Sequence, residues 1–216
     1  MTGRAMGVHN GRWRVAPYGR RAVLVDLDGQ EDVLGLHGAL DHEPPEGVVE
    51  LVPAARTLLV RFDPERTSHE RLADDLLRHS TVDVSARAGR EVVIEVRYDG
   101  EDLAEVAECT GLSVAEVVTR HEQGGYVAAF CGFAPGFAYL TGLDPALHVP
   151  RRATPRTRVP AGAVAIAGEY TAVYPNSSPG GWRLLGHTGH PVWDVERARP
   201  NLLTPGTRVR FTRARR

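Results

Sequence analysis

The stretch that decides the fold of this chain is Phe130-Cys131-Gly132-Phe133-Ala134-Pro135-Gly136-Phe137-Ala138-Tyr139-Leu140. Pro135-Gly136 interrupts any helix, so the aromatic side chains of this stretch cannot form one helical face. The pattern predicts a strand that reaches Phe130, a tight turn at Ala134-Pro135-Gly136, and a second extended run over 137–140. Glycines beside aromatic residues allow the backbone to approach a ligand or another strand closely. The stretch is therefore either a packed hairpin at the corner of a barrel or the rim of a binding site.

The composition is that of a globular protein with one or two domains. The chain has 216 residues, of which 42% are hydrophobic and 25% charged. A net charge of −1 gives no general attraction to nucleic acid or to an anionic membrane. The sequence has no apolar run long enough for a membrane span and no signal-peptide core at its N-terminus, so we expect a cytoplasmic protein.

All 26 basic residues are arginine, and the sequence contains no lysine. This excludes a lysine Schiff base and a Walker-type phosphate loop, which needs a lysine. If the protein binds ATP, it must use another kind of binding site or bind ATP through a partner protein. The arginine fork clamps carboxylate or phosphate at two points, so anion binding remains open.

The first part of the chain is predicted to be a small α/β domain. Its expected elements are an extended run over 13–26 with a break at 17–19, a helix through 33–40, strands over 48–51 and 57–62, and a helix opened by a capping box of Thr67 and Glu70. This β-α-β-β-α order suits a small open sheet with helices on one face. The polar segment 83–90 is predicted to be a linker, which places the domains at 1–88 and 89–216.

The second part begins with a predicted strand over 91–98 and two short helices. The first helix ends at Gly111, and the second opens with a capping box of Ser113 and Glu116. From Tyr126 to the end, short strands alternate with Gly/Pro turns, which is typical of a barrel or a sandwich. Together the two parts predict the α+β class.

The helix pair is similar to a helix-turn-helix, but its charge does not suit DNA. The second helix carries Glu116 and only Arg120 as a nearby base. A helix that reads the major groove needs donors for phosphates and base edges. We therefore expect two packed covering helices and no nucleic-acid partner.

The histidines offer one candidate for proton transfer. His121 ends the second helix, where the helix dipole favours a histidine for structural reasons. It also precedes the aromatic stretch, so a proton-transfer or hydrogen-bonding role is the alternative. His187 and His190 lie three residues apart without a helix or an evident third ligand, so we expect no metal site.

Two further motifs follow the aromatic stretch. The run 150–160 carries arginines in a proline-punctuated, extended backbone, and alternation points Arg152, Arg156 and Arg158 to one side. It is either a solvated basic edge or a clamp for a carboxylate or phosphate. The glycine-rich segment 176–182 is expected to be a turn that presents the indole of Trp182.

These motifs together resemble the family of the bacterial 5-oxoprolinase B subunit, also called allophanate hydrolase subunit 1 or the Kip-type sporulation-kinase inhibitor, with a carboxyltransferase C/D-type domain. The likeness rests on Gly132-Phe133-Ala134-Pro135-Gly136-Phe137-Ala138-Tyr139-Leu140, Pro155-Arg156, Val159-Pro160-Ala161-Gly162, Val164-Ala165-Ile166-Ala167-Gly168, Tyr174-Pro175, and Ser178-Pro179-Gly180-Gly181-Trp182 with Gly186. In order and spacing these motifs cover most of the second half of the chain.

The resemblance implies a small α/β first domain and a cyclophilin-like β-barrel second domain. It also implies membership of an ATP-dependent 5-oxoprolinase, which opens 5-oxo-L-proline to L-glutamate with the help of a homologous C subunit and a lactam-handling A subunit. ATP would be used with these partners, and the chain is expected to be inactive alone. The alternatives are a regulatory protein that inhibits a sensor histidine kinase and a component of an allophanate hydrolase.

Within that resemblance we predict Arg156 as an anion contact and His121 as a polar participant in catalysis. The predicted substrate-binding residues are Phe133, Pro135, Gly136, Phe137, Tyr139, Arg152, Gly180, Gly181 and Trp182. The aromatic stretch, the arginine run and the indole turn should then gather around one shared cleft.

Overall fold

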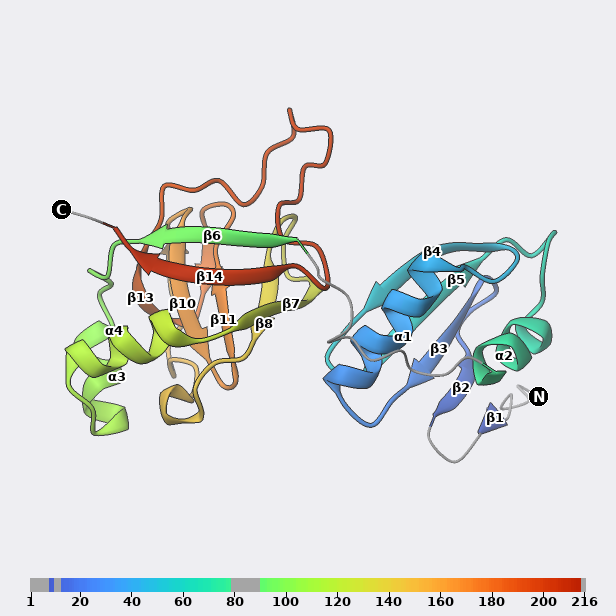
Figure 1. Ribbon diagram of the computed structural model, residues 1–216, viewed down its shortest axis with the longest axis horizontal. Coiled ribbons are helices and arrows are strands. Elements are labelled where there is room, and N and C mark those ends of the chain that lie inside the picture. Colours follow the sequence, from blue (N-terminus) through green and yellow to red (C-terminus); the bar gives the residue numbers. More distant parts are fainter. Residues whose placement is uncertain (1–7, 10–12, 79–89, 215–216) are drawn as a thin grey trace. The chain divides into compact units, whose positions relative to one another are not determined.

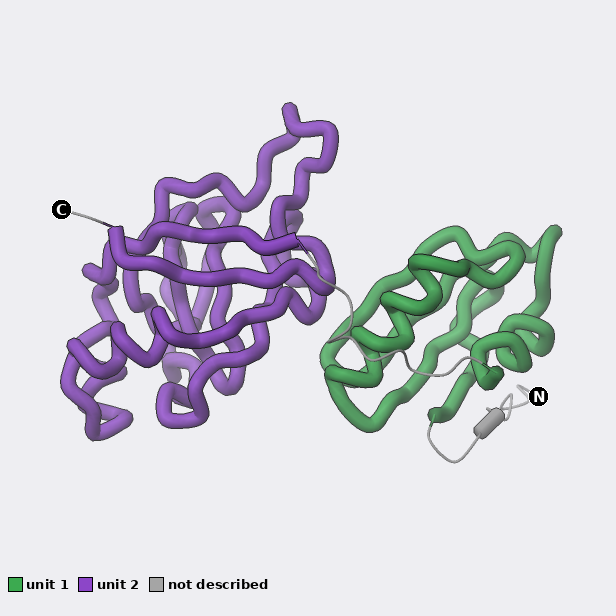
Figure 2. Tube along the Cα trace, viewed as in Figure 1, with its two compact units in different colours: residues 1–88 green, residues 89–216 purple. Residues whose placement is uncertain are grey.

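The computed structural model describes residues 8–9, 13–78 and 90–214. The chain divides into two compact units, residues 1–88 and residues 89–216 (Figure 2). The predicted linker over 83–90 lies, apart from Arg90, outside the described residues. Each unit has a hydrophobic core of its own.

Unit 1 is an antiparallel sheet with two helices (Figure 1). Its elements are β1 (Val8–His9), β2 (Arg14–Pro17), β3 (Ala22–Asp26), α1 (Gln30–His42), β4 (Val48–Pro53), β5 (Thr57–Phe62) and α2 (His69–Arg78). The sheet order is β1-β2-β3-β5-β4. The predicted order β-α-β-β-α counted 13–26 as a single extended run with a break, whereas the structure folds it into a β2–β3 hairpin. Gly19 has a φ of 65°, which allows the chain to reverse there.

The core of unit 1 shows why these segments form strands and helices. Alternate residues of β3 and β5 are buried, as are residues at helical spacing in α1 and α2. They form one cluster that includes Val23, Val25, Leu36, Leu40, Leu58, Val60, Leu72 and Leu76. One detail of the prediction was wrong: Ser68, not Thr67, caps α2, since its Oγ accepts a hydrogen bond from the backbone N–H of Arg71 at 3.3 Å.

Unit 2 is built around a seven-stranded sheet. Its elements are β6 (Glu91–Val96), α3 (Leu103–Thr110), α4 (Val114–Gln123), β7 (Tyr126–Cys131), β8 (Ala138–Thr141), the 3₁₀ helix η2 (Pro145–Leu147), β9 (Arg156–Val159), β10 (Ala163–Ala167), β11 (Tyr170–Val173), β12 (Ser178–Gly180), β13 (Arg183–His187) and β14 (Arg208–Arg213). The sheet order is β13-β10-β11-β8-β7-β14-β6, and β9 pairs separately with β12. The segment 178–180, expected to be a turn, is thus a short strand.

The seven-stranded sheet is nearly closed into a barrel. Its two edge strands are β6 and β13. Just beyond β6, the backbone of Arg97 donates to His187 at 2.8 Å and accepts from it at 2.9 Å. This pair joins the two edges, so the predicted mixed class of helix and sheet with a barrel is confirmed.

The helices α3 and α4 lie beside one another at one side of the barrel (Figure 1). Gly111 ends α3 with a φ of 69°. The capping box of Ser113 and Glu116 that opens α4 is confirmed. Leu103 and Val106 of α3 and Val117 of α4 are buried in the barrel core, as expected for covering helices.

The stretch 130–140 forms the predicted hairpin between β7 and β8. The N–H of Phe137 donates to the carbonyl of Ala134 at 3.0 Å and closes the turn. Gly136 has a φ of 82°, and a Cβ at this position would lie 2.5 Å from the Cβ of Trp193. The turn therefore requires glycine both for its conformation and for its packing.

Candidate functional site

Four ring side chains from three parts of unit 2 pack into what we call the aromatic layer, formed by Phe137, Tyr139, Tyr174 and Trp182. The centroid of the Phe137 ring lies 5.3 Å from that of Tyr174 and 5.5 Å from that of Trp182. Tyr139 lies 5.5 Å from Trp182. All these pairs meet edge to face, an arrangement that aromatic rings favour. Phe137, Tyr174 and Trp182 are buried and Tyr139 is half-buried, so the layer is mostly a packed core and not the open wall that the sequence suggested.

Phe133 at the tip of the hairpin differs from these rings. Its side chain is 61% exposed, while its ring contacts Phe137 and Tyr174 edge to face. Its backbone has a φ of 68°, which is rare for a residue other than glycine. Pro135 is exposed beside it. The hairpin therefore holds an apolar ring in solvent at a strained backbone position.

Arg152 and Arg156 meet at a buried carboxylate. Asp102, which is only 2% exposed, precedes α3. Its Oδ1 accepts hydrogen bonds from Arg152 Nη1 and from Arg156 Nη2, both at 2.7 Å. Its Oδ2 accepts the backbone N–H of Leu184, also at 2.7 Å. Asp102 thus joins α3, the arginine run and β13.

The environment of Asp102 keeps it ionised. Burial acts to raise the pKa of this carboxyl, but the hydrogen bonds from Arg156 and Leu184 and the charges of Arg156 and Arg152 outweigh burial and lower the pKa. The paired arginines are accordingly held by a negative charge that persists to acidic pH.

Two more carboxylates and a third arginine lie beside this group. We call the whole set the arginine cluster; it consists of Arg152, Arg156 and Arg183 with Glu101, Asp102 and Glu105. Glu101 Oε2 accepts from Arg156 Nε at 3.2 Å and from Nη2 at 3.1 Å. Glu105 lies 3.3 Å from Arg152 Nη1 and 2.6 Å from Arg183 Nη1. The charge balance is three arginines against three carboxylates. The predicted basic clamp is therefore already neutralised by acidic groups of the same chain.

The two clusters are neighbours. In the β9–β12 pair, Gly180 lies opposite Arg156. A Cβ on Gly180 would lie 2.3 Å from the hydroxyl of Tyr174, and one on Gly181 would contact Pro155 at 3.6 Å. Gly180 therefore allows the β9–β12 ribbon to lie against the aromatic layer, whereas a Cβ at Gly181 would make only an ordinary contact. The guanidinium of Arg151 also lies 5.9 Å from the centre of the Trp182 ring.

Tyr139 and Trp182 therefore contact each other, and Arg156 lies opposite Gly180 on the neighbouring strand, while the predicted shared cleft stays a prediction. Burial raises the pKa of Tyr174, a member of the aromatic layer, and the charges of Arg151 and Arg156 oppose that rise. This region is where charged and aromatic side chains of the predicted site converge.

His121 is not part of this convergence. Its side chain is completely buried, with Nδ1 2.8 Å from the hydroxyl of Tyr98 and Nε2 3.0 Å from Oγ1 of Thr171. Its ring stacks on Phe211 at 4.7 Å. Burial lowers the pKa of His121 to about 3, so the imidazole is neutral at physiological pH. This geometry favours a structural role in the barrel core over the predicted catalytic one.

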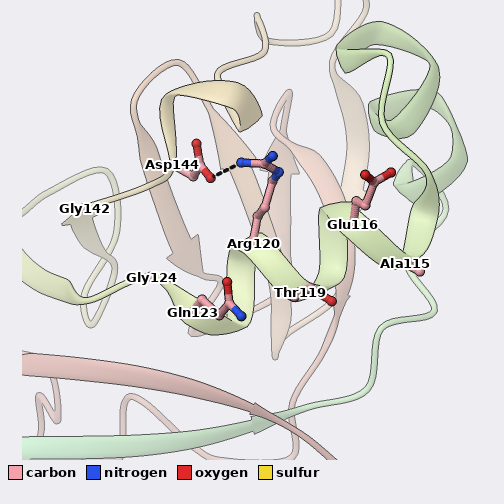
Figure 3. Close-up of a pocket in the computed structure, with 8 residues that line it drawn as sticks. All are labelled: Ala115, Glu116, Thr119, Arg120, Gln123, Gly124, Gly142 and Asp144. Atoms are coloured by element: carbon pink, nitrogen blue, oxygen red, sulfur yellow. Dashed lines mark hydrogen bonds and ion pairs between the residues drawn. The ribbon is translucent and has the colours of Figure 1, made fainter.

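A hollow of about 480 Å³ lies elsewhere, between α4 and the segment before η2 (Figure 3). Its lining includes Thr119, Gln123, and the ion pair of Arg120 with Asp144 at 2.7 Å. None of the predicted site residues lines it. We therefore do not include this hollow in the candidate site.

The sequence reasoning missed the acidic half of the arginine cluster. Glu101, Asp102 and Glu105 lie some fifty residues before their partners in the arginine run. A signal was available: three acidic residues at the start of a helix are matched in number by the three arginines of the cluster. The fold was needed to show that the two runs meet.

The described residues contain no group of three or more His, Cys, Asp or Glu side chains placed to hold a metal ion. None of the helices in the described ranges is long and apolar enough to cross a membrane. The use of ATP with partner subunits stays a prediction.

Comparison with known proteins gives consistent matches. The family model described as carboxyltransferase domain, subdomain C and D, matches residues 13–203. The chain is 54% identical to the 5-oxoprolinase B subunit of Escherichia coli O157:H7 over 125 residues, which are 56% of this chain and 57% of that protein. It is 35% identical to the 5-oxoprolinase B subunit of Bacillus subtilis (strain 168) over 224 aligned residues, covering 94% and 93% of the two chains.

A solved structure is also similar to this chain. The crystal structure of TTHA0988 superposes with a TM-score of 0.78 and 43% identity, over 90% of this chain and 40% of that chain. The match thus spans less than half of that longer protein and little more than half of the E. coli relative.

Proposed function

Because this chain belongs to the carboxyltransferase family, subdomain C and D, we propose that it is one component of an ATP-dependent 5-oxoprolinase that opens 5-oxo-L-proline to L-glutamate. Two relatives named as the B subunit of 5-oxoprolinase support this. The observation that carries the proposal is the placement of Arg156 beside the aromatic layer. Tyr139, the one half-buried ring of this layer, suits the apolar face of a small lactam, and the guanidinium of Arg156 suits its carboxylate.

In this proposal the chain contributes binding and charge stabilisation. Ring opening of an unstrained lactam is slow, and phosphorylation of its oxygen by ATP would turn that oxygen into a leaving group. The homologous C subunit and the lactam-handling A subunit would supply the nucleotide and complete the site. Arg156, with Arg152 beside it, would hold the substrate carboxylate while charge develops on the ring.

The other predicted residues take supporting roles. Gly180 lets the β9–β12 ribbon approach the layer, and Gly136 fixes the hairpin that carries Phe133. His121 orders the barrel core by bonding Tyr98 and Thr171.

Reconstitution tests the proposal. The chain is mixed with homologues of the C and A subunits, and ATP hydrolysis is measured with and without 5-oxoproline. We expect 5-oxoproline-dependent release of phosphate only when all components are present. Hydrolysis that is unaffected by omission of this chain would overturn the proposal. The same assay with allophanate distinguishes the related hydrolase activity.

One observation favours a second candidate of a different class. Phe133 is exposed and held at a strained backbone position, and such strained residues cluster at functional sites. A regulatory protein that inhibits a sensor histidine kinase would use such a surface. Inhibition of kinase autophosphorylation that Phe133→Asn removes, without any lactam-dependent ATP hydrolysis, would favour this candidate.

A further inference from the structure

The contact between Glu101 and Arg156 differs from the other contacts of the arginine cluster. The Glu101 side chain is 77% exposed, whereas Asp102 is 2% exposed. A single oxygen of Glu101 accepts both hydrogen bonds, at 3.1 and 3.2 Å. Charge-assisted bonds are usually about 2.7–2.9 Å long, and the strongest carboxylate–arginine pairs use two oxygens on two parallel N–H groups. Glu101 thus covers the Nε–Nη2 edge of Arg156 with two hydrogen bonds that are longer than usual and share one oxygen.

The other two carboxylates each contact two arginines. Asp102 receives three bonds of 2.7 Å, and Glu105 spans Arg152 and Arg183. Only Glu101, among the three carboxylates, can swing into solvent without breaking a contact that joins two arginines. If it does, the balance of three arginines and three carboxylates becomes three against two. The cluster then has room for one negative charge at the edge of Arg156.

A second observation shows unused donor capacity in the same pair of arginines, on other nitrogens than those that Glu101 contacts. Arg152 Nε and Arg156 Nη1 are buried, and within the described residues they have no hydrogen-bond partner. A buried donor without a partner is costly, so such donors usually indicate a missing acceptor. Both belong to the two arginines that Asp102 holds together.

From these contacts we propose that Glu101 is a placeholder carboxylate: it covers the edge of Arg156 in the free protein and is displaced by the carboxylate of the ligand. This inference rests on the proposed function for the choice of ligand. Asp102 is the permanent anchor that keeps both arginines in place during the exchange, and the ligand class is a small molecule with one carboxylate, represented by 5-oxoproline.

The test is a binding titration of 5-oxoproline by calorimetry, with the full chain alone and with its partner subunits. Glu101→Gln removes the competing charge and should tighten binding about two- to fivefold, which corresponds to the strength of an exposed ion pair. Glu108→Gln is the matched control, because it removes an exposed charge from α3 that lies outside the arginine cluster. It should bind as the wild type does. In the Arg156→Ala background, Glu101→Gln should no longer tighten binding.

Several results would overturn the placeholder. The first is a Glu101→Gln protein whose affinity for 5-oxoproline equals or is lower than that of the wild type. The second is an equal gain in affinity from Glu108→Gln. The third is the absence of 5-oxoproline binding in every variant. The outcome is separable from the proposed function. A gain specific to Glu101→Gln without lactam-dependent ATP hydrolysis leaves the placeholder standing and removes the function. Lactam-dependent ATP hydrolysis together with a Kd for 5-oxoproline that Glu101→Gln does not change would support the proposed function and overturn the placeholder.

Discussion

Replacement of Asp102 by alanine tests the architecture of the arginine cluster. The substitution removes three hydrogen bonds of 2.7 Å, so the Leu184 N–H loses its acceptor and the two guanidinium groups lose their buried one. Loss of one partner from a buried ion pair costs about 3–5 kcal/mol. The side chains of Arg152 and Arg156 are 31% and 17% exposed, so water recovers part of their solvation. We therefore expect a loss near the lower limit, about 3 kcal/mol, in the free energy of unfolding of unit 2.

The assay is urea denaturation followed by tryptophan fluorescence. Trp13 belongs to unit 1, whereas Trp182 and Trp193 belong to unit 2, so a Trp13→Phe background makes the signal specific for unit 2. Glu108→Ala, on the exposed face of α3, is the control and should leave the denaturation midpoint almost unchanged. A loss of less than about 1 kcal/mol for Asp102→Ala would refute the reasoning, because a typical single hydrogen bond contributes that much.

Two further predictions use the same readout. Since the pKa of His121 is about 3 in the folded state and about 6.5 when unfolded, unfolding takes up a proton below about pH 6.5. Stability should therefore fall as the pH drops from about 6.5 towards 3, and the fall should be shallower in His121→Gln; identical pH profiles would contradict this. Gly180→Ala places a Cβ 2.3 Å from the Tyr174 hydroxyl and should cost about 1–3 kcal/mol, part of which Tyr174→Phe should restore. A Gly180→Ala protein as stable as wild type would mean that the ribbon does not lie against the aromatic layer.

Local sequence signals predicted much of the fold. The proline and glycine at 135–136 placed the hairpin, the Ser113–Glu116 box placed the start of α4, and Gly111 placed the end of α3. These features depend on residues close together in the chain, whose backbone preferences act locally. The capping residue of α2 was misplaced by one position because Thr67 and Ser68 are adjacent and chemically alike.

The site was harder to predict because its contacts are not local. The partners of Arg152 and Arg156 lie some fifty residues earlier, and only closure of the barrel brings β13 and the start of α3 to the arginine run. The burial of individual side chains could not be predicted from the sequence either. His121 looks like an accessible helix-terminal residue in the sequence, yet the stacking of Phe211 and the bonds to Tyr98 and Thr171 enclose it.

The central claim is that Arg156 holds the carboxylate of a lactam substrate. The most direct measurement is the KM for 5-oxoproline of the reconstituted complex with Arg156→Ala, compared with Arg158→Ala. Arg158 is on the same strand but is exposed and bonds Ser177. We predict that Arg156→Ala raises KM by about tenfold or more, as expected for loss of a hydrogen bond to a charged group, while Arg158→Ala leaves it unchanged. Equal KM values for Arg156→Ala and wild type would contradict the claim.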